Sequence, residues 1–217
     1  MKKITSISIQ KKNPNRVNID LDGEFAFGLA RITAAWLKTG DVLSEEQIEK
    51  LQADDTREHA YQQSLLYLSY RARSEKEIRQ NLRKHEIPEA IIEETLERLK
   101  NSRLADDNQF AQMWVENRNT FRPRSKRALE IELRQKGLTN EAILASLSKV
   151  DEEALAYEAG SKRATRLNGQ EWSEFRKKLS EFLARRGFSY STVAPVVSKI
   201  WKETHADAQQ HEDEDTP

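Results

Sequence analysis

The most constraining feature of this chain is an internal repeat with a period of about 50 residues. A shift of 51 positions places Arg73-Ser74 on Arg124-Ser125, and a further shift of 50 positions reaches a third, weaker copy. The recurring apolar positions are Ile78, Leu129 and Leu179; Leu82, Leu133 and Leu183; Ile92, Ile143 and Val193; and Leu96, Leu147 and Val197. Self-similarity at such a period is typical of repeat proteins.

Each copy is predicted to contain three helices, because apolar residues after position 57 follow the 3.6-residue helical period. The expected units are residues 57–104, 105–150 and 151–204. A three-helix unit of this size buries little surface alone, so we expect tandem stacking into an elongated, curved array. The alternative, a compact bundle with coincidental spacing, is less favoured because the apolar positions and the Arg-Ser pair shift together. Pro195, in the third unit, is expected either to shift a helix start or to bend the helix.

Residues 1–56 have a different pattern. Val17, Ile19 and Leu21 alternate with polar residues, as in a half-buried strand, and Asp22-Gly23 is typical of a type I′ hairpin turn. We therefore expect a small three-stranded antiparallel sheet. A short helix over 29–37 and a second helix, opened by a capping box at Ser44, are predicted to follow it.

The composition excludes several kinds of functional site. The chain has equal numbers of basic and acidic residues and no cysteine, which excludes disulfides, thiolate metal sites and cysteine nucleophiles. No stretch approaches the ~20 apolar residues that span a bilayer, so a soluble, cytoplasmic protein is expected. The charge is unevenly distributed, because residues 108–150 are basic and residues 205–217 form an acidic tail that we expect to be disordered.

No catalytic motif is present. The four histidines are scattered, and His85 occupies an expected turn between helices. The carboxylate pairs Glu75/Glu77 and Glu93/Glu94 are interpreted as surface ion-pair partners on helices rather than as a general acid and base. The aromatic stripe around Phe110 and Trp114 is interpreted as core packing. We therefore expect no enzymatic activity, no metal site and no cofactor.

The strongest polar signal is a basic cluster over residues 118–127. Cations at a helix N-terminus oppose the helix dipole, so local helix stability does not explain them. The alternatives are a solvated loop, or a face that binds phosphate or an acidic protein surface. The candidate binding residues are Arg118, Arg122, Arg124, Lys126 and Arg127, with Arg71 and Arg73 at the equivalent loop of the first unit.

Several motifs resemble the signature of the RecX family, the regulators of the RecA recombinase. They are Arg71-Ala72-Arg73-Ser74-Glu75-Lys76-Glu77-Ile78, Leu104-Ala105-Asp106-Asp107-Asn108-Gln109-Phe110-Ala111, Trp114-Val115, Arg118, Arg124-Ser125 and Leu133-Arg134-Gln135-Lys136-Gly137-Leu138. The segment 15–24 also resembles the β segment of longer members. Their order and spacing together make the resemblance specific.

The resemblance implies a non-catalytic protein of tandem three-helix repeats, and we expect the protein to be a monomer. Its partner would be the RecA filament, with single-stranded DNA reached through the filament groove. Binding there would restrain ATP hydrolysis, strand exchange and co-protease activity. The alternative is a helical protein that binds DNA directly without the recombinase. The segments 74–84 and 88–100 could pass for a helix-turn-helix, but the second carries four glutamates, a poor face for a DNA groove.

Overall fold

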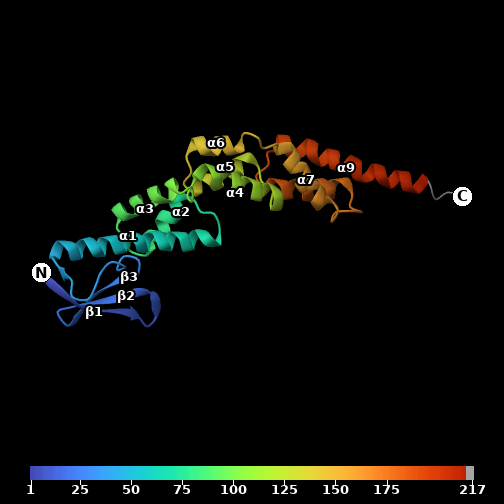
Figure 1. Cartoon of the computed structure of the whole chain (residues 1–217). Helices are drawn as coiled ribbons and strands as arrows, with labels where there is room; N and C mark the ends of the chain where they lie inside the picture. Colours follow the sequence, from blue (N-terminus) through green and yellow to red (C-terminus); the bar gives the residue numbers. More distant parts are fainter. Residues whose placement is uncertain (214–217) are drawn as a thin grey trace. The chain divides into compact units, whose positions relative to one another are not determined.

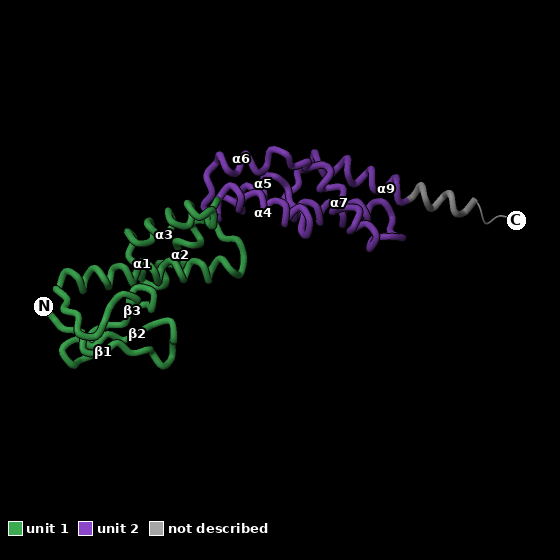
Figure 2. The backbone as a smooth tube through the Cα atoms, in the orientation of Figure 1, with its two compact units in different colours: residues 1–106 green, residues 107–217 purple. Residues whose placement is uncertain are grey.

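The computed structural model describes the backbone of residues 1–213 and the side chains of residues 1–204. It comprises two compact units, residues 1–106 and residues 107–217 (Figures 1 and 2). The strands are β1 (Lys2–Gln10), β2 (Asn13–Leu21), β3 (Glu24–Ala30) and β4 (Val42–Leu43). The helices are α1 (Glu45–Tyr70), α2 (Glu75–Lys84), α3 (Glu89–Asn101), α4 (Asp107–Phe121), α5 (Lys126–Gln135), α6 (Asn140–Leu147), α7 (Glu152–Ala164), α8 (Trp172–Ala184) and α9 (Tyr190–Asp213). The acidic tail expected at 205–217 lies outside the residues whose side chains are described.

The N-terminal sheet is antiparallel with strand order β3-β2-β1-β4. The predicted hairpin turn is confirmed, because Asp22 and Gly23 both have positive φ, 53° and 94°. The sheet has four strands rather than three, since the two-residue β4 pairs with β1. A strand of two residues is too short to show alternation, which is why the sequence did not reveal it.

The short helix predicted over 29–37 is wrong. Leu29 belongs to β3, opposite Val17 of β2, and residues 31–36 form turns. Leu29 is fully buried in the core of the sheet, so it continues the alternation of Phe27. Because β3 pairs with β2 as far as Ala30, the first residues of the expected helix belong to a strand instead.

Helix α1 crosses the boundary that the sequence analysis placed between residues 56 and 57. It begins with the predicted capping box at Ser44 and continues without a Gly or Pro to Tyr70. Near that boundary, Asp55 accepts hydrogen bonds from the Ala30 backbone N–H and from the Arg16 guanidinium, the latter at 2.8 Å. The helix thus holds the sheet at its first half and forms part of the first three-helix repeat at its second half (Figure 1).

The internal repeat is confirmed by burial. The first recurring apolar set, Ile78, Leu129 and Leu179, is fully buried in all three copies. The second set, Leu82, Leu133 and Leu183, is also 0% exposed throughout. Ser74 and Ser125 are both fully buried and cap the N-termini of α2 and α5. Equivalent residues therefore occupy equivalent places in the successive repeats.

The turn after the second helix of each repeat is also repeated. Glu86, Gly137 and Gly187 stand at the same position and adopt positive φ angles of 59°, 89° and 90°. In each repeat the next residue donates its N–H to a carbonyl five residues back, as Leu138 does to Leu133 at 3.2 Å. This is the Schellman geometry that ends helices. His85 caps the first of these helices, which confirms its prediction as a turn residue.

The third repeat contains Pro195 inside helix α9. The helix begins at Tyr190, ahead of the proline, so the predicted alternative of a shifted helix start is wrong. The Thr192 and Val193 N–H groups donate to the Ser189 carbonyl, at 3.0 and 2.9 Å, and start the helix there. Within the described residues, no helix is long and apolar enough to cross a membrane.

Candidate functional site

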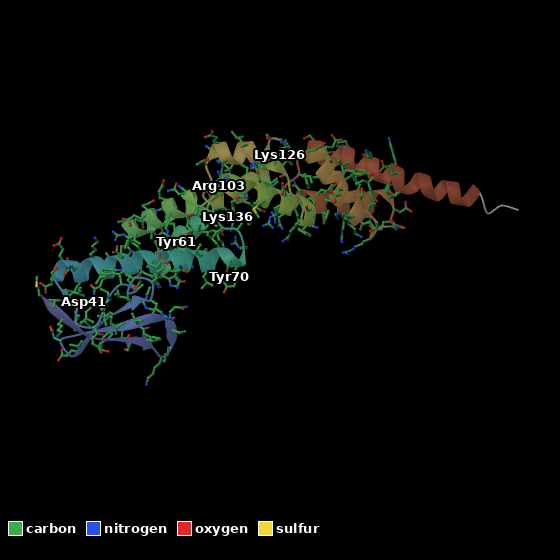
Figure 3. The ribbon with its side chains drawn as sticks, in the orientation of Figure 1. Asp41, Tyr61, Tyr70, Arg103, Lys126 and Lys136 are labelled. Carbon is green, nitrogen blue, oxygen red and sulfur yellow. The ribbon has the colours of Figure 1, made fainter. Side chains whose placement is uncertain are left out.

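The predicted basic cluster lies where helix α4 ends and helix α5 begins. Helix α4 ends at Phe121, and the Ser125 side chain accepts a hydrogen bond from the Ala128 N–H at 3.1 Å to start α5. Between them Pro123 is buried, whereas Arg122 is exposed. Figure 3 shows Lys126 at the beginning of α5 and Lys136 just beyond its end. The cluster thus spans the last turn of α4, a short loop with one buried proline, and the first turn of α5.

The fold brings an acid to this cluster that the local sequence does not contain. The Glu132 carboxylate accepts hydrogen bonds from Arg118 Nε and Trp114 Nε1, both at 2.8 Å. It also forms an ion pair with Arg124 Nε at 3.0 Å. Since the Glu132 side chain is only 16% exposed, this ion-pair cluster is partly shielded from water. Arg118 and Arg124 are therefore held inside the repeat by an acid that lies outside residues 118–127.

Other members of the cluster remain available to a partner. Arg122 and Arg127 are exposed, and within residues 1–204 neither side chain has an ion-pair partner. The Lys126 backbone N–H donates to Glu152 at 3.4 Å, which places one carboxylate beside that residue. Arg122 and Arg127 are therefore the two predicted residues that best fit an electrostatic contact.

Arg186 is a candidate that the sequence analysis missed. It follows α8, and its Nη1 donates to the Pro123 carbonyl at 3.0 Å. Burial lowers the pKa of Arg186, and repulsion from Arg122 and Arg124 lowers the pKa further. One signal was present in the sequence, because Arg186 stands one residue before Gly187, as the basic Lys136 stands before Gly137. The contact with Pro123 joins the second and third repeats and was not visible from spacing.

The two arginines predicted in the first repeat are also held by neighbouring residues. The Arg71 guanidinium donates to both carboxylate oxygens of Glu77, at 2.9 and 3.1 Å. The hydrogen bonds to Glu77 raise the pKa of Arg71. Arg73 lies over the Tyr67 ring, with its guanidinium carbon 3.9 Å from the ring centroid. These residues belong to the first compact unit, whereas the cluster of residues 118–127 belongs to the second.

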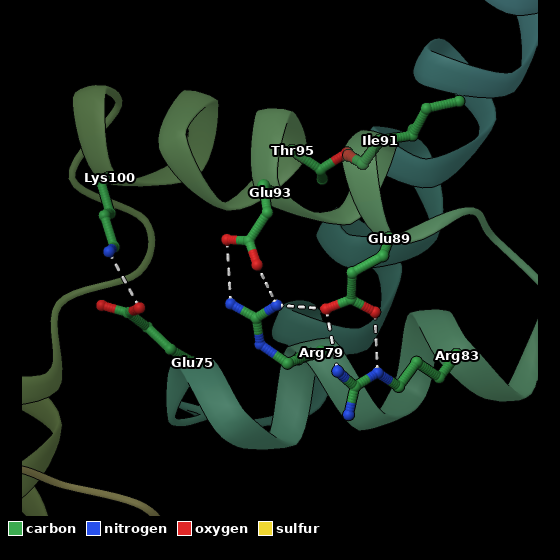
Figure 4. A network of polar contacts seen from close by, with 8 residues as sticks. All are labelled: Glu75, Arg79, Arg83, Glu89, Ile91, Glu93, Thr95 and Lys100. Carbon is green, nitrogen blue, oxygen red and sulfur yellow. Dashed lines mark hydrogen bonds and ion pairs between the residues drawn. The ribbon is translucent and has the colours of Figure 1, made fainter.

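The predicted carboxylate pairs are confirmed as ion-pair partners. Arg79 binds Glu89 and Glu93 together, and Arg83 binds Glu89 at 2.8 Å (Figure 4). Lys100 binds Glu75 at 2.9 Å across the same pair of helices, α2 and α3. Two glutamates of α3, Glu89 and Glu93, thus form ion pairs with arginines of α2. Helix α3 consequently presents acids and ion pairs, a poor surface for reading a DNA groove.

The aromatic stripe packs mainly into the core, as predicted. Phe110 and Val115 are 4% and 3% exposed. The Trp114 ring stacks on Phe110 at 5.7 Å and carries the Arg118 and Lys136 cations at 4.5 and 4.8 Å. Trp114 therefore does more than pack in the core. Its ring makes cation–π contacts with Arg118 and Lys136, and its N–H donates a hydrogen bond to Glu132, so it helps to position these side chains. In the third repeat, Phe175 is likewise fully packed, against Trp201.

Chemistry-bearing groups do not converge in the part of the chain whose side chains are described. No three His, Asp or Glu side chains there are placed to hold a metal ion. The ion-pair clusters around Arg79 and Glu132 consist of arginine and glutamate side chains, which are charged at neutral pH. Such clusters bind and orient other molecules by charge.

Comparison with known proteins agrees with this architecture. The model of the Regulatory protein RecX N-terminal domain matches residues 2–44, and the RecX first, second and third three-helix domains match residues 60–99, 106–147 and 151–197. The Regulatory protein RecX of Bacillus pumilus is 34% identical over 98% of this chain and 81% of its own length. That of Leuconostoc mesenteroides is 31% identical over 92% of this chain and 76% of its own.

A solved structure supports the same assignment. The crystal structure of a regulatory protein RecX aligns with a TM-score of 0.67 and 30% identity, covering 90% of this chain and 98% of that one. Sequence, domain order and fold therefore agree from the N-terminal sheet through the third repeat. The chain belongs to the RecX family of regulatory proteins.

Proposed function

We propose that this protein binds the RecA–single-stranded-DNA filament and restrains the recombinase, its ATP hydrolysis and its co-protease activity. The observation that carries the proposal is the presence of all four RecX domains in order along one chain. Tandem repeats offer extended surfaces, which suit a long partner such as a filament. The protein would act by binding, without catalysis and without a cofactor, as a cytoplasmic monomer in DNA repair and the SOS response.

The basic loop of the second repeat is the surface proposed to meet the filament. Arg122 and Arg127 lead this assignment because both are exposed and unpaired among the described residues. Arg118 and Arg124 contribute more weakly because Glu132 neutralises part of their charge. Lys126, Arg71 and Arg73 remain predicted contacts. Charge of this kind accelerates association and orients the partner.

ATP hydrolysis by the recombinase on single-stranded DNA tests the proposal. Titration of this protein at substoichiometric amounts should lower the rate of hydrolysis, because a filament regulator affects many protomers at once. The double variant R122E/R127E should inhibit about tenfold less at equal concentration, since two attractive contacts become repulsive. The matched control is R134E, which reverses one charge on α5 at a residue already paired with Glu130.

Two results would contradict the proposal. No inhibition at a stoichiometric excess of the wild-type protein would remove the filament as partner. Equal inhibition by R122E/R127E and R134E would remove the basic loop as the contact surface. Inhibition that follows coverage of bare DNA, with a steep salt dependence and no need for the recombinase, would instead favour direct DNA binding.

A further inference from the structure

An open cavity of about 810 Å³ lies in the first compact unit, between one end of the sheet and the middle of helix α1. Arg16 of β2 and Arg31, which follows β3, line it on the side of the sheet. His59 and Leu66 line it on the side of α1, which Figure 1 shows beside these strands. All of its lining residues belong to the first unit, whereas the basic loop belongs to the second. We call it the α1 cavity.

One wall of the α1 cavity is apolar and open to solvent. Ile32, in the turns after β3, is 70% exposed, and Leu66 of α1 is 53% exposed. Ile87, which follows α2, is partly buried and lines the same cavity. Large aliphatic side chains from three separate segments that face one cavity indicate an interaction site, unlike single apolar residues scattered over a surface. The wall suits an aliphatic side chain of a ligand.

Arg16 provides a fixed cation in this cavity. Its Nη2 atom donates to Asp55 at 2.8 Å and to the Gly28 carbonyl at 3.0 Å. Both bonds use Nη2, so within residues 1–204 the Nη1 and Nε donors have no protein acceptor. Because Asp55 is buried, it holds the guanidinium in place before a ligand arrives. A preorganised donor loses little side-chain freedom on binding.

The acids that line the α1 cavity already have partners. Asp55 pairs with Arg16, and Glu58 pairs with Arg98 at 3.1 Å. Arg31 is exposed and has no ion pair within residues 1–204, and the His59 ring has no hydrogen-bond partner there. A ligand would therefore meet unused donors and no unpaired carboxylate, so the cavity complements an anion.

We propose that the α1 cavity binds an acidic segment of a partner protein, in extended conformation and carrying a leucine or isoleucine. A carboxylate would bind Arg16 and Arg31, since guanidinium groups match carboxylate oxygens with two parallel hydrogen bonds. The aliphatic side chain would pack on the apolar wall. Asn15 and Gln63 also line the cavity, and their amides offer the donors and acceptors that a peptide backbone requires.

A nucleotide or a nucleic acid is the other anion that the cations could attract. Single-strand binding usually depends on bases that stack on aromatic rings beside cations. No Phe, Tyr or Trp side chain lines the α1 cavity, and its apolar wall is aliphatic. These features favour a protein segment. The inference goes beyond the proposed function, because it concerns a different surface and does not require the recombinase.

Fluorescence anisotropy with the full-length protein tests the inference. The probe is a short labelled peptide in which glutamate and leucine alternate, so that acids and aliphatic side chains lie on opposite faces when it is extended. A peptide with serine in place of leucine removes the aliphatic contact, and one with lysine in place of glutamate reverses the charge. Each of these two peptides should bind about tenfold more weakly or less.

The double variant R31Q/I32S removes one cation and one part of the apolar wall. It should weaken binding of the glutamate–leucine peptide by about tenfold, because a charge-assisted hydrogen bond and an aliphatic contact are both lost. The matched control is K38Q/I9S, which changes an exposed cation and an exposed isoleucine outside the cavity. All four positions are exposed, so the variants should fold, and circular dichroism checks this.

His59 gives an independent readout of an anion in the cavity. The charged and titratable groups near it are Arg16 and Arg31 from the sheet, Asp55 and Glu58 from α1, and His85 after α2. A bound carboxylate favours the charged imidazolium, so the peptide should bind about threefold more tightly near pH 6 than near pH 8, where glutamate stays ionised throughout. H59Q should abolish this pH dependence.

The outcomes separate this inference from the proposed function. The inference would be overturned by a wild-type protein that does not bind the glutamate–leucine peptide, by equal affinities of R31Q/I32S and K38Q/I9S, or by preference for either altered peptide. Loss of labelled oligo(dT) binding in R31Q/I32S, with peptide binding intact, would make the cavity a nucleic-acid site and refute it too. Inhibition of recombinase ATP hydrolysis could persist in all these cases. Conversely, peptide binding that depends on Arg31 and Ile32, with no effect on the recombinase, would uphold the inference and refute the proposed function.

Discussion

Gly187 of the third repeat packs against Ser125 of the second so closely that a Cβ atom on residue 187 would lie 2.7 Å from Ser125 Oγ. Ser125 cannot move away freely, because its hydroxyl caps helix α5. Gly187→Ala should therefore destabilise the protein by about 3 kcal/mol, from left-handed strain of about 1–2 kcal/mol and the overlap. Urea unfolding followed by tryptophan fluorescence measures the change.

Gly169 provides the matched control for Gly187. It has a positive φ of 78°, and nothing lies within 4 Å of the place where its Cβ would be. Gly169→Ala should therefore lower the free energy of unfolding by about 1 kcal/mol, which comes from the left-handed backbone strain alone. Equal losses in the two variants would show that the contact between the repeats is not tight.

Glu86 is the one non-glycine residue among the three equivalent turn positions. Its φ of 59° is unfavourable for a residue with a Cβ atom, whereas glycine serves this position in the other two repeats. Glu86→Gly should raise the free energy of unfolding by about 0.5–1 kcal/mol. Thermal unfolding by circular dichroism should show a higher midpoint. Glu86→Ala is the control and should give no gain, because alanine keeps the strain.

Glu132 is predicted to be the most sensitive acid of the second repeat. Glu132→Gln removes the charge that faces Arg118 and Arg124, both less than a third exposed. The expected loss of stability is about 1–2 kcal/mol, as measured by urea unfolding. Glu130→Gln, which disrupts the exposed pair with Arg134, should change stability by less than about 0.5 kcal/mol. A reversed ranking would contradict the structural role of Glu132.

His59 should make the first unit sensitive to acid. It lines an open cavity of about 810 Å³ together with Arg16 and Asp55. Burial lowers the pKa of His59 from its ordinary 6.5, and repulsion by Arg16 lowers it further, against attraction from Asp55. At mildly acidic pH, His59 is therefore protonated to a greater extent in the unfolded chain than in the folded protein. Stability should fall as the pH drops through 6.5.

The variant His59→Gln checks this assignment. The free energy of unfolding, measured by urea titration between neutral and mildly acidic pH, should decline less steeply in H59Q than in the wild-type protein. The difference should appear below pH 6.5, where the unfolded histidine becomes charged. Parallel curves for the two proteins would show that His59 does not titrate differently in the folded state.

The repeats were predictable from sequence because each depends on local rules. Ser74 and Ser125 are helix caps, and Gly137 and Gly187 are helix ends, so each residue fulfils its role within its own helix. The apolar period then decides which face of each helix is buried. Glu86 shows the limit of such rules, because the fold imposes the left-handed turn on a residue that does not favour it.

The errors in the prediction occurred where distant segments compete for the same residues. Leu29 pairs in strand β3 with β2 and therefore does not belong to the expected helix. Helix α1 runs through residues 56 and 57, a feature that the sequence pattern did not show. The ion pair between Asp55 of α1 and Arg16 of the sheet shows why α1 has no break near residue 56. The turn that carries Asp55 contacts the sheet, and the following turns pack in the core of the first repeat. No local pattern reveals such a double role.

The sequence by itself determined the number of repeats, their caps and turns, the hairpin at Asp22-Gly23 and the location of the basic loop. Only the tertiary structure decided which cations remain free. Glu132 neutralises arginines from another helix and loop, and Arg186 reaches the loop from the next repeat. The physical reason is that helix caps and periodicity depend on neighbours in the chain, whereas charge compensation depends on neighbours in space.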